Sequence, residues 1–301
     1  MISQNLDEAF DQVTKLVDNR IDELLPKRSE FSESNLVEAM RYSALSKGKR
    51  IRPFLTIVSA ELFKVPPQYS LDVATVIEFI HVYSLIHDDL PAMDNDDYRR
   101  GQLSCHKKFN EATAILAGDC LLTYAFQILS SPNTVFDPHI RCELINVITR
   151  AIGFNGMAGG QMIDLEAEFD PNLTPEKVAR LHRLKTGEMF MASVEAGAIL
   201  GKASPILRKS LIRYAHDIGL AFQIRDDILD HYGEDGSKLS AKKLESRNSQ
   251  DKTSIVNVLG LERSTNQLNL LYDQAVSHLK PFGDRANLLR QLAEFIVVRN
   301  R

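Results

Sequence analysis

Cysteines, net charge and long apolar runs are scarce in this sequence, and their scarcity argues against several protein classes. Its three cysteines, Cys105, Cys120 and Cys142, are odd in number and lack metal-ligand spacing, so we expect reduced thiols. A formal net charge of −4 implies no general affinity for nucleic acid or membrane surfaces. No apolar run reaches about 18 residues, and residues 1–11 carry no basic side chain, so neither a membrane-spanning helix nor a cationic leader is predicted. We expect a soluble cytoplasmic protein without nucleic-acid or membrane partners.

The alternating pattern of β-strands is almost absent as well. Apolar residues instead recur at helical spacing, and with 44% hydrophobic residues the 301-residue chain can bury a large core. The sequence predicts an all-α fold, a single-domain bundle covering residues 1–301 around buried helices. In the helix expected before residue 130, we expect these side chains to face inward: Ala114, Leu116, Ala117, Leu121 and Leu122.

The stretch from Glu78 to Gly101 begins as a helix that is apolar almost all round and therefore buried. A polar stripe formed by His81, Ser84 and Asp88 lies within about 60° on this helix. Such a stripe on a buried helix predicts a cavity. Carboxylates follow it, at Asp88, Asp89, Asp94, Asp96 and Asp97.

The spacing of Asp88 and Asp94 would separate them by about 240° on a straight helix. Pro91 lies between them and breaks helical hydrogen bonding, so we expect the chain to turn and bring Asp94 back beside Asp88. Clustered buried carboxylates need compensation. A divalent cation with oxygen ligands and bound phosphates would supply it, and the following Arg99 and Arg100 suit phosphate groups.

A second carboxylate cluster occurs in the segment FQIRDDILD, at Asp226, Asp227 and Asp230. Asp226 and Asp230 share one helix face because they are four residues apart, and Gly219 and Gln223 lie on or near that face. Two such clusters facing one cavity would hold a polyanion.

Further polar features accompany these clusters. Basic residues crowd around Gly48, among them Lys49 and Arg52. In a chain that also has two carboxylate clusters, this crowding favours an anion site over a merely solvated turn. Gly187 inside a predicted helix marks a kink that would free backbone carbonyls. The glycines of GFNGMAGG permit close backbone approach, and Gln161 and Asp164 could face the cavity, although for Asp164 an exposed or capping carboxylate is equally compatible with the sequence. The polar segment 234–252 has the length of a functional lid.

A ligand with a diphosphate head and a hydrocarbon tail satisfies both the charged groups and the apolar cavity. At this point the chain resembles the trans-prenyl diphosphate synthases of the polyprenyl synthetase family, and among them the bacterial farnesyl diphosphate synthases. The resemblance covers nearly the whole chain and rests on six ordered blocks: GKRIRP, HVYSLIHDDLPAMDNDDYRRG, AILAGD, GMAGGQMIDL, LHRLKTG and AFQIRDDILD.

The resemblance implies the isoprenoid synthase fold and a set of site residues. Metal ligation falls to Asp88, Asp89, Asp94, Asp226, Asp227 and Asp230, with three Mg²⁺ per site and Mn²⁺ able to substitute. The allylic diphosphate, dimethylallyl or geranyl, would contact Arg99, Lys185, Lys242 and Lys252. Isopentenyl diphosphate would contact Lys49, Arg52, His81 and Arg100. Thr186 and Gln223 would line the reacting region, and the family suggests a homodimer.

The implied reaction is ionisation of the allylic diphosphate, attack by isopentenyl diphosphate and loss of a proton, giving farnesyl diphosphate. Catalysis would involve Asp88, Asp226, Lys185, Thr186 and Gln223. Carbonyl dipoles near Lys185 and Thr186 would stabilise the allylic cation, and exclusion of water would protect it.

Product length should depend on the pocket beneath Asp88, where Ser84 lies one turn below and Tyr83 one residue further. Farnesyl-forming bacterial members carry an aromatic residue at the position of Tyr83.

One departure from the family pattern concerns the predicted lid. Where the family has GKxxGxD, this chain reads AKKLESR from Ala241, which retains Lys242 but replaces both glycines and the aspartate. This change affects the geometry of the predicted lid and the role of Lys242. Lys238 or Lys243 could take the place of Lys242.

Several other protein classes share parts of this pattern. A geranylgeranyl or geranyl diphosphate synthase would share all six blocks. A class I terpene cyclase would not need a second diphosphate site, and a non-catalytic regulatory subunit should have lost carboxylates that this chain keeps. An HD-type phosphohydrolase would need further His and Asp residues, and Tyr98 occupies the third-ligand position of a calcium loop.

Overall fold

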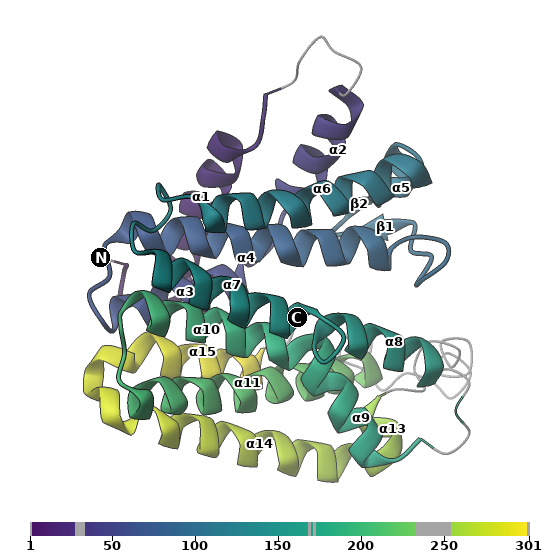
Figure 1. Ribbon diagram of the computed structural model, residues 1–301. Helices are drawn as coiled ribbons and strands as arrows, with labels where there is room; N and C mark the ends of the chain where they lie inside the picture. The colour runs from purple at the N-terminus through teal and green to yellow at the C-terminus, as the bar shows by residue number, and fades with distance from the viewer. Residues whose placement is uncertain (1, 28–33, 168–169, 171–172, 233–253, 300–301) are drawn as a thin grey trace. The chain divides into compact units, whose positions relative to one another are not determined.

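The computed structural model describes residues 2–27, 34–167, 170, 173–232 and 254–299 (Figure 1). Within this part the regular elements are all helices except for one pair of two-residue strands, which confirms the predicted all-α class. The predicted lid, including Lys242 and Lys252, lies outside the described residues. The chain forms two compact units, residues 1–145 with 199–201, and residues 146–198 with 202–301.

The first unit contains the helices α1 to α6, one hairpin and the first half of α7. Their bounds are α1 (Leu6–Leu24), α2 (Ser34–Ala44), α3 (Ile51–Glu61), α4 (Pro67–Asp88), β1 (Tyr98–Arg99), β2 (Gln102–Leu103), α5 (Cys105–Lys108), α6 (Glu111–Ser130) and α7 (Pro138–Ile152). The central helix α4 packs against α3 and α6 and also contacts α1 and α2. Figure 1 shows α4 and α6 running side by side. Because α4 is surrounded, apolar residues are buried on all its sides, as predicted.

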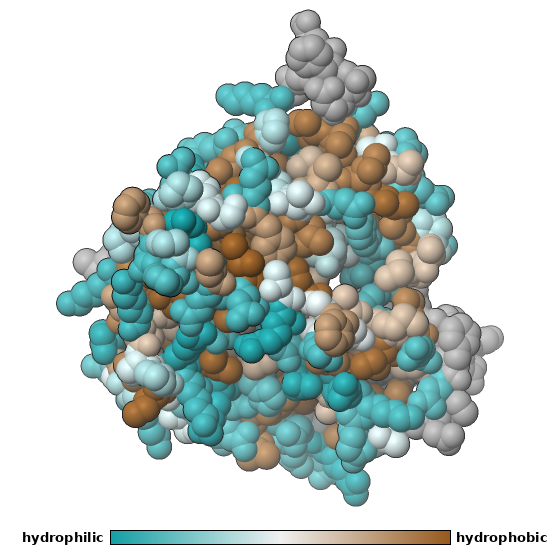
Figure 2. All heavy atoms as spheres, viewed as in Figure 1, coloured by the Kyte–Doolittle hydropathy of each residue, from teal (hydrophilic) through white to brown (hydrophobic). Residues whose placement is uncertain are grey.

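Helix α4 starts with Pro67, whose fixed φ and missing N–H suit the first helical turn. By length and composition α4 and α6 could each cross a membrane, but the apolar window of α4 is 67% buried inside the protein and that of α6 is 39% buried. Core helices of non-membrane proteins have these properties too. On the face drawn in Figure 2, polar residues are interspersed with apolar ones over the described part of the chain.

The inward face predicted for α6 is only partly right. Ala114, Ala117 and Leu121 are buried, whereas Leu116 is 53% exposed and Leu122 is partly exposed. Leu116 lies outside the buried stripe, because Gly118 continues that stripe on one side of Ala117 and Leu116 lies 100° away on the other side.

The second unit contains the rest of α7 and the helices that follow it. Their bounds are α8 (Met157–Ala167), α9 (Pro175–His182), the π-helical turn η1 (Arg183–Gly187), α10 (Glu188–Leu200), α11 (Pro205–Tyr232), α13 (Ile255–Leu259), α14 (Leu261–His278), the 3₁₀ turn η2 (Lys280–Ala286) and α15 (Asn287–Val298). Helix α11 packs against α14, α15, α13 and η1. The buried Tyr214 of α11 donates a 2.7 Å hydrogen bond to the carbonyl of Leu289, which ties α15 to it.

Candidate active site

The end of α4 turns as the sequence predicts. The backbone N–H of Asp94 donates to the carbonyl of Asp88 at 2.8 Å, and Asn95 closes the same turn onto Leu90 with φ of 53°. Pro91 lies at the exposed outside of this turn. Asp88 and Asp94 are therefore neighbours at the helix end, both partly exposed.

The carboxylate of Asp89 has a different environment from those of Asp88 and Asp94. Asp89 is 2% exposed, and its Oδ1 accepts hydrogen bonds from Arg99, one of them from Nε at 2.8 Å. Burial raises the pKa of Asp89, while Arg99 opposes this shift. Arg99 also contacts Asp96 at 2.8 Å. Asp89 thus anchors Arg99 to the end of α4.

The hairpin β1–β2 positions the next arginine. Arg99 pairs with Gln102, so Arg100 and Gly101 form a two-residue turn in which both φ angles are positive, 53° and 79°. This is the pattern of hairpin turns that match strand twist. A non-glycine residue rarely adopts this conformation. Sequence reasoning missed the hairpin, although the glycine after two arginines was a signal for it.

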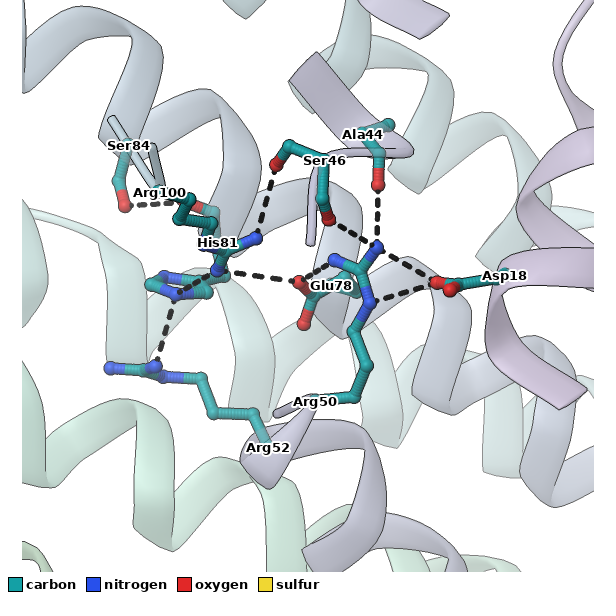
Figure 3. Close-up of polar contacts among 9 residues, drawn as sticks. All are labelled: Asp18, Ala44, Ser46, Arg50, Arg52, Glu78, His81, Ser84 and Arg100. Atoms are coloured by element: carbon teal, nitrogen blue, oxygen red, sulfur yellow. Dashed lines mark hydrogen bonds and ion pairs between the residues drawn. The ribbon is translucent and has the colours of Figure 1, made fainter. Parts of the chain in front are cut away.

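A cluster of three arginines and one histidine lies behind this hairpin, in the first unit (Figure 3). His81 Nε2 lies 3.3 Å from Arg52 Nη1 and 3.4 Å from Arg100 Nη2. Guanidinium nitrogens only donate, so Nε2 must be the acceptor and the ring proton lies on Nδ1. Burial, then the charges of Arg52 and Arg100, lower the pKa of His81 well below its usual value, so the ring is neutral.

The excess of positive charge in this cluster also affects Arg52 itself. Burial lowers the pKa of Arg52 to about 10; Glu78 opposes the shift and Arg100 adds to it. The pKa of Arg100 is lowered by burial and by its neighbours Arg50 and Arg99, against the effect of Glu78. Lys49 is exposed beside the cluster. The structure therefore brings three of the four residues predicted for isopentenyl diphosphate into contact, and Lys49 precedes one of them, Arg52, by three residues.

Ser84 and Tyr83 lie on α4 between this cluster and the Asp88 turn. Ser84 Oγ donates to the carbonyl of His81 at 2.8 Å, and the ring of Tyr83 meets that of His87 edge-on with centroids 5.6 Å apart. Both residues are partly exposed.

In the second unit the predicted interruption at Gly187 takes the form of the π-helical turn η1. Its carbonyl at Arg183 accepts from the N–H of Glu188, five residues on. A methyl group at Gly219 of α11 would lie 3.1 Å from Gly187 Cα, and one at Gly160 of α8 would lie 2.3 Å from Lys185 N. Glycine at these positions lets α8 and α11 approach η1 closely, as predicted for GFNGMAGG.

Side chains also connect η1 with its neighbours. Lys185 Nζ contacts Asp164 Oδ2 of α8 at 2.6 Å. Thr186 Oγ1 donates to Gln223 Oε1 of α11 at 3.2 Å. The structure thus brings Thr186 and Gln223 together and gives Asp164 a cationic partner.

Asp227 is the inward-facing carboxylate of the second cluster. Its Oδ2 accepts from the N–H of Ile255 at 2.6 Å, at the first turn of α13, and its Oδ1 from Gln223 Nε2 at 3.4 Å. Burial raises the pKa of Asp227 to about 7, against these hydrogen bonds. Asp227 therefore has a structural contact, whereas Asp226 is partly exposed and Asp230 is exposed on the same helix face.

Sequence reasoning did not assign a role to Arg299. Its Nη2 pairs with Asp226 Oδ1 at 2.5 Å, and its guanidinium carbon lies 4.1 Å from the centre of the Phe222 ring. The carbonyl of Arg299 accepts two hydrogen bonds from Arg225. The only signal in the sequence was the concentration of basic residues at 299–301.

The donor chemistry of both clusters suits a hard cation. Among the described residues no three His, Cys, Asp or Glu side chains are arranged as a ready metal site. Mg²⁺ usually takes one or two protein carboxylates, several waters and substrate phosphates. Asp88 with Asp94 and Asp226 with Asp230 are partly or fully exposed and so fit that requirement better than Asp89 and Asp227, which are buried.

Comparison with known proteins identifies the family of this chain. A family model described as polyprenyl synthetase matches residues 33–287. The chain belongs to the polyprenyl synthetase family. It is similar to the farnesyl diphosphate synthase of Micrococcus luteus, 42% identical over 94% of this chain and 96% of that one, and to that of Escherichia coli, 41% identical over 90% and 91%.

A solved structure from Zymomonas mobilis, titled an FPP/GFPP synthase, has a TM-score of 0.88 and 44% identity and covers 98% of this chain and 99% of its own. The resemblance drawn from the six sequence blocks and the isoprenoid synthase fold are thereby confirmed.

Proposed function

We propose that this polyprenyl synthetase condenses isopentenyl diphosphate with dimethylallyl and then geranyl diphosphate to give farnesyl diphosphate. The observation that carries the proposal is the arginine–histidine cluster around His81, a site built from cationic side chains where the aspartate clusters are built from carboxylates. A prenyl chain-elongating enzyme needs two diphosphate sites. A terpene cyclase needs one.

The cluster is suited to the diphosphate of isopentenyl diphosphate. Arg52 and Arg100 offer guanidinium forks, which bind phosphate oxygens in pairs. Neutral His81 keeps the two forks near each other without adding a further charge. Lys49 supplies an exposed ammonium group beside them.

The allylic diphosphate is assigned to the aspartate clusters. Asp88 and Asp94 would hold Mg²⁺ in the first unit and Asp226 and Asp230 in the second, with three ions in the complete site and Mn²⁺ as a substitute. When bound, Mg²⁺ supplies charge neutralisation for the departing diphosphate. Lys185, Arg99, Lys242 and Lys252 are the side chains proposed to contact this diphosphate directly.

The chain's own contribution to the chemical step comes from η1 and α11. A π-helical turn disrupts regular helical hydrogen bonding, and such turns are frequent at functional sites. Carbonyl oxygens there, with Thr186 Oγ1 and Gln223 Oε1, place partial negative charge where the allylic cation would develop. Isopentenyl diphosphate attacks the cation through its double bond, and the resulting carbocation loses a proton to the departed diphosphate. The product retains the diphosphate that isopentenyl diphosphate brought.

Tyr83 and Ser84 are proposed to form the floor that limits the chain at fifteen carbons. A geranylgeranyl or geranyl product is the second candidate, because this floor consists of only two partly exposed side chains on one helix. A non-catalytic regulatory subunit is the candidate of a different class, and the six aspartates of the two clusters, all present in this chain, argue against it.

The deciding experiment is incubation of the protein with Mg²⁺, labelled isopentenyl diphosphate and each allylic primer in turn. Turnover of dimethylallyl and geranyl primers without elongation of farnesyl diphosphate supports the proposal. Elongation of the farnesyl primer would indicate a longer product, and lack of turnover with every primer would support the regulatory role. We further propose a cytoplasmic homodimer, which size-exclusion chromatography with light scattering would test.

A further inference from the structure

Arg50 and Glu78 lie within the basic cluster but have no place in the proposed reaction. The side chain of Arg50 is fully buried, and its backbone at the start of α3 has φ of 48°. Its guanidinium donates to Asp18, Glu78 and the carbonyls of Ala44 and Ser46, at 2.5 to 2.9 Å. With its donors engaged by protein acceptors, Arg50 is suited to fixing Glu78 rather than to binding a ligand.

Glu78 is a carboxylate held at a defined position. It is 1% exposed on the rigid central helix α4, and Arg50 Nη1 donates to its Oε1 at 2.5 Å. The same oxygen lies 3.8 Å from Arg100 Nη2 (Figure 3). That distance permits strong electrostatic attraction but is too long for a hydrogen bond.

Arg100 is therefore attracted by Glu78 while its donors are held only loosely. Its other contacts, to Ser46 Oγ at 3.3 Å and His81 Nε2 at 3.4 Å, are near the upper limit of hydrogen bonding. Among the described residues, Glu78 is the carboxylate within 4 Å of Arg100. A diphosphate arriving at this cluster would compete with Glu78 for the same guanidinium.

We propose that Glu78 limits the affinity of the basic cluster for diphosphate by sharing Arg100 with the ligand. This inference rests on the proposed function. The buried carboxylate of Glu78 would then speed product release, because the elongated product keeps the diphosphate bound at this cluster and must leave from it. Without a competing anion, Arg52 and Arg100 would hold that diphosphate more tightly and the product would leave more slowly.

The test is calorimetric titration of isopentenyl diphosphate into the whole protein in metal-free buffer. Glu78→Gln keeps the size of the side chain and an oxygen acceptor for Arg50 but removes the charge. We expect it to bind isopentenyl diphosphate about tenfold more tightly, the size of effect that one charge produces across several ångströms of protein. In steady-state assays its KM for isopentenyl diphosphate and its kcat should both fall, because product release slows.

Two further variants separate charge from structure. Glu78→Asp keeps the charge but draws it towards α4 and away from Arg100, so its affinity should lie between those of the wild type and Glu78→Gln. Asp18→Asn is the matched control: it removes a carboxylate from Arg50 at a more exposed position and with a smaller effect on Arg100, so affinity should change less than in Glu78→Gln. If Glu78 were merely structural, both Glu78 variants would bind isopentenyl diphosphate more weakly than the wild type, and that result would overturn the inference. If only Glu78→Asp folds, weaker binding by that variant alone would overturn it.

Arg100→Met distinguishes the two possible failures. If it loses affinity while Glu78→Gln gains none, the inference fails and the proposed site stands. If Arg100→Met binds as well as the wild type, or the wild type does not bind, the assignment of this cluster to isopentenyl diphosphate fails and the inference fails with it.

Discussion

Gly48 offers a way to displace Arg100 without removing it. A methyl group at Gly48 would lie 2.9 Å from both Cζ and Nη1 of Arg100. Carbon atoms in contact prefer about 3.5 Å or more, so Gly48→Ala must move the guanidinium by about 0.6 Å. A shift of that size would change its contacts to Ser46 and His81, now 3.3 and 3.4 Å, which are already near the upper limit of hydrogen bonding. The fold should be preserved, because the displaced atoms form the end of a flexible side chain.

The expected effect is on binding of isopentenyl diphosphate. A hydrogen bond to a charged group contributes about 1.5–3 kcal/mol, which corresponds to about a 10- to 100-fold change in an equilibrium constant. We expect Gly48→Ala to raise KM for isopentenyl diphosphate within this range and to leave KM for the allylic primer unchanged. Steady-state kinetics with each substrate varied in turn measures both values.

A double-mutant cycle provides the control. If the added methyl group acts through Arg100, Gly48→Ala should have little further effect in an Arg100→Met background. Equal effects in both backgrounds, or a wild-type KM in the single variant, would refute the reasoning. Thermal unfolding of all four proteins would reveal any loss of stability that complicates the comparison.

Three further predictions concern other parts of the site. Tyr83→Ala should lengthen the product and Ser84→Phe should shorten it towards geranyl; chromatography of dephosphorylated products decides, and unchanged lengths in both would reject the proposed floor. Gly160→Ala should destabilise the protein by about 1–3 kcal/mol, the usual cost of overpacking, because its methyl group would lie 2.3 Å from backbone N of Lys185; an unchanged urea midpoint would contradict this. Removal of divalent metal with EDTA should abolish turnover but leave isopentenyl diphosphate binding intact in calorimetry.

The main features of the first aspartate cluster follow from the sequence because they depend on local physics. An apolar helix must be buried, and Pro91 must end it, so the return of Asp94 towards Asp88 is predictable. The interruption near Lys185 is predictable for the same kind of reason, since Gly187 weakens the helix locally. The exact form of that interruption, a π-helical turn, depends on packing against α8 and α11.

Other features depend on tertiary contacts that local patterns do not encode. The hairpin after Asp97 has strands of two residues, too short for alternation, and Arg100 adopts a positive φ within it. Arg50 follows Lys49 in the same basic segment, yet its side chain is buried and forms ion pairs with two carboxylates, one from α1 and one from α4. No sequence spacing distinguishes these neighbouring basic residues, because Asp18 and Glu78 are 32 and 28 residues away.

The wide turn of η1 adds one residue to the helix without changing which way the following helix faces. The hydrogen bond from Glu188 to Arg183 spans five residues where an α-helix spans four. The five residues of this π-helical turn cover about the same arc as four α-helical residues, so deleting one residue between Arg183 and Gly187 would let the helix continue regularly with α10 in nearly its present rotation. Phe190, which is fully buried with its ring centre 5.4 Å from that of Phe222, would then stay in the core. The additional residue therefore alters the carbonyls of η1 and leaves the interior side of α10 unchanged, so a one-residue deletion here should remove the wide turn without unfolding the protein.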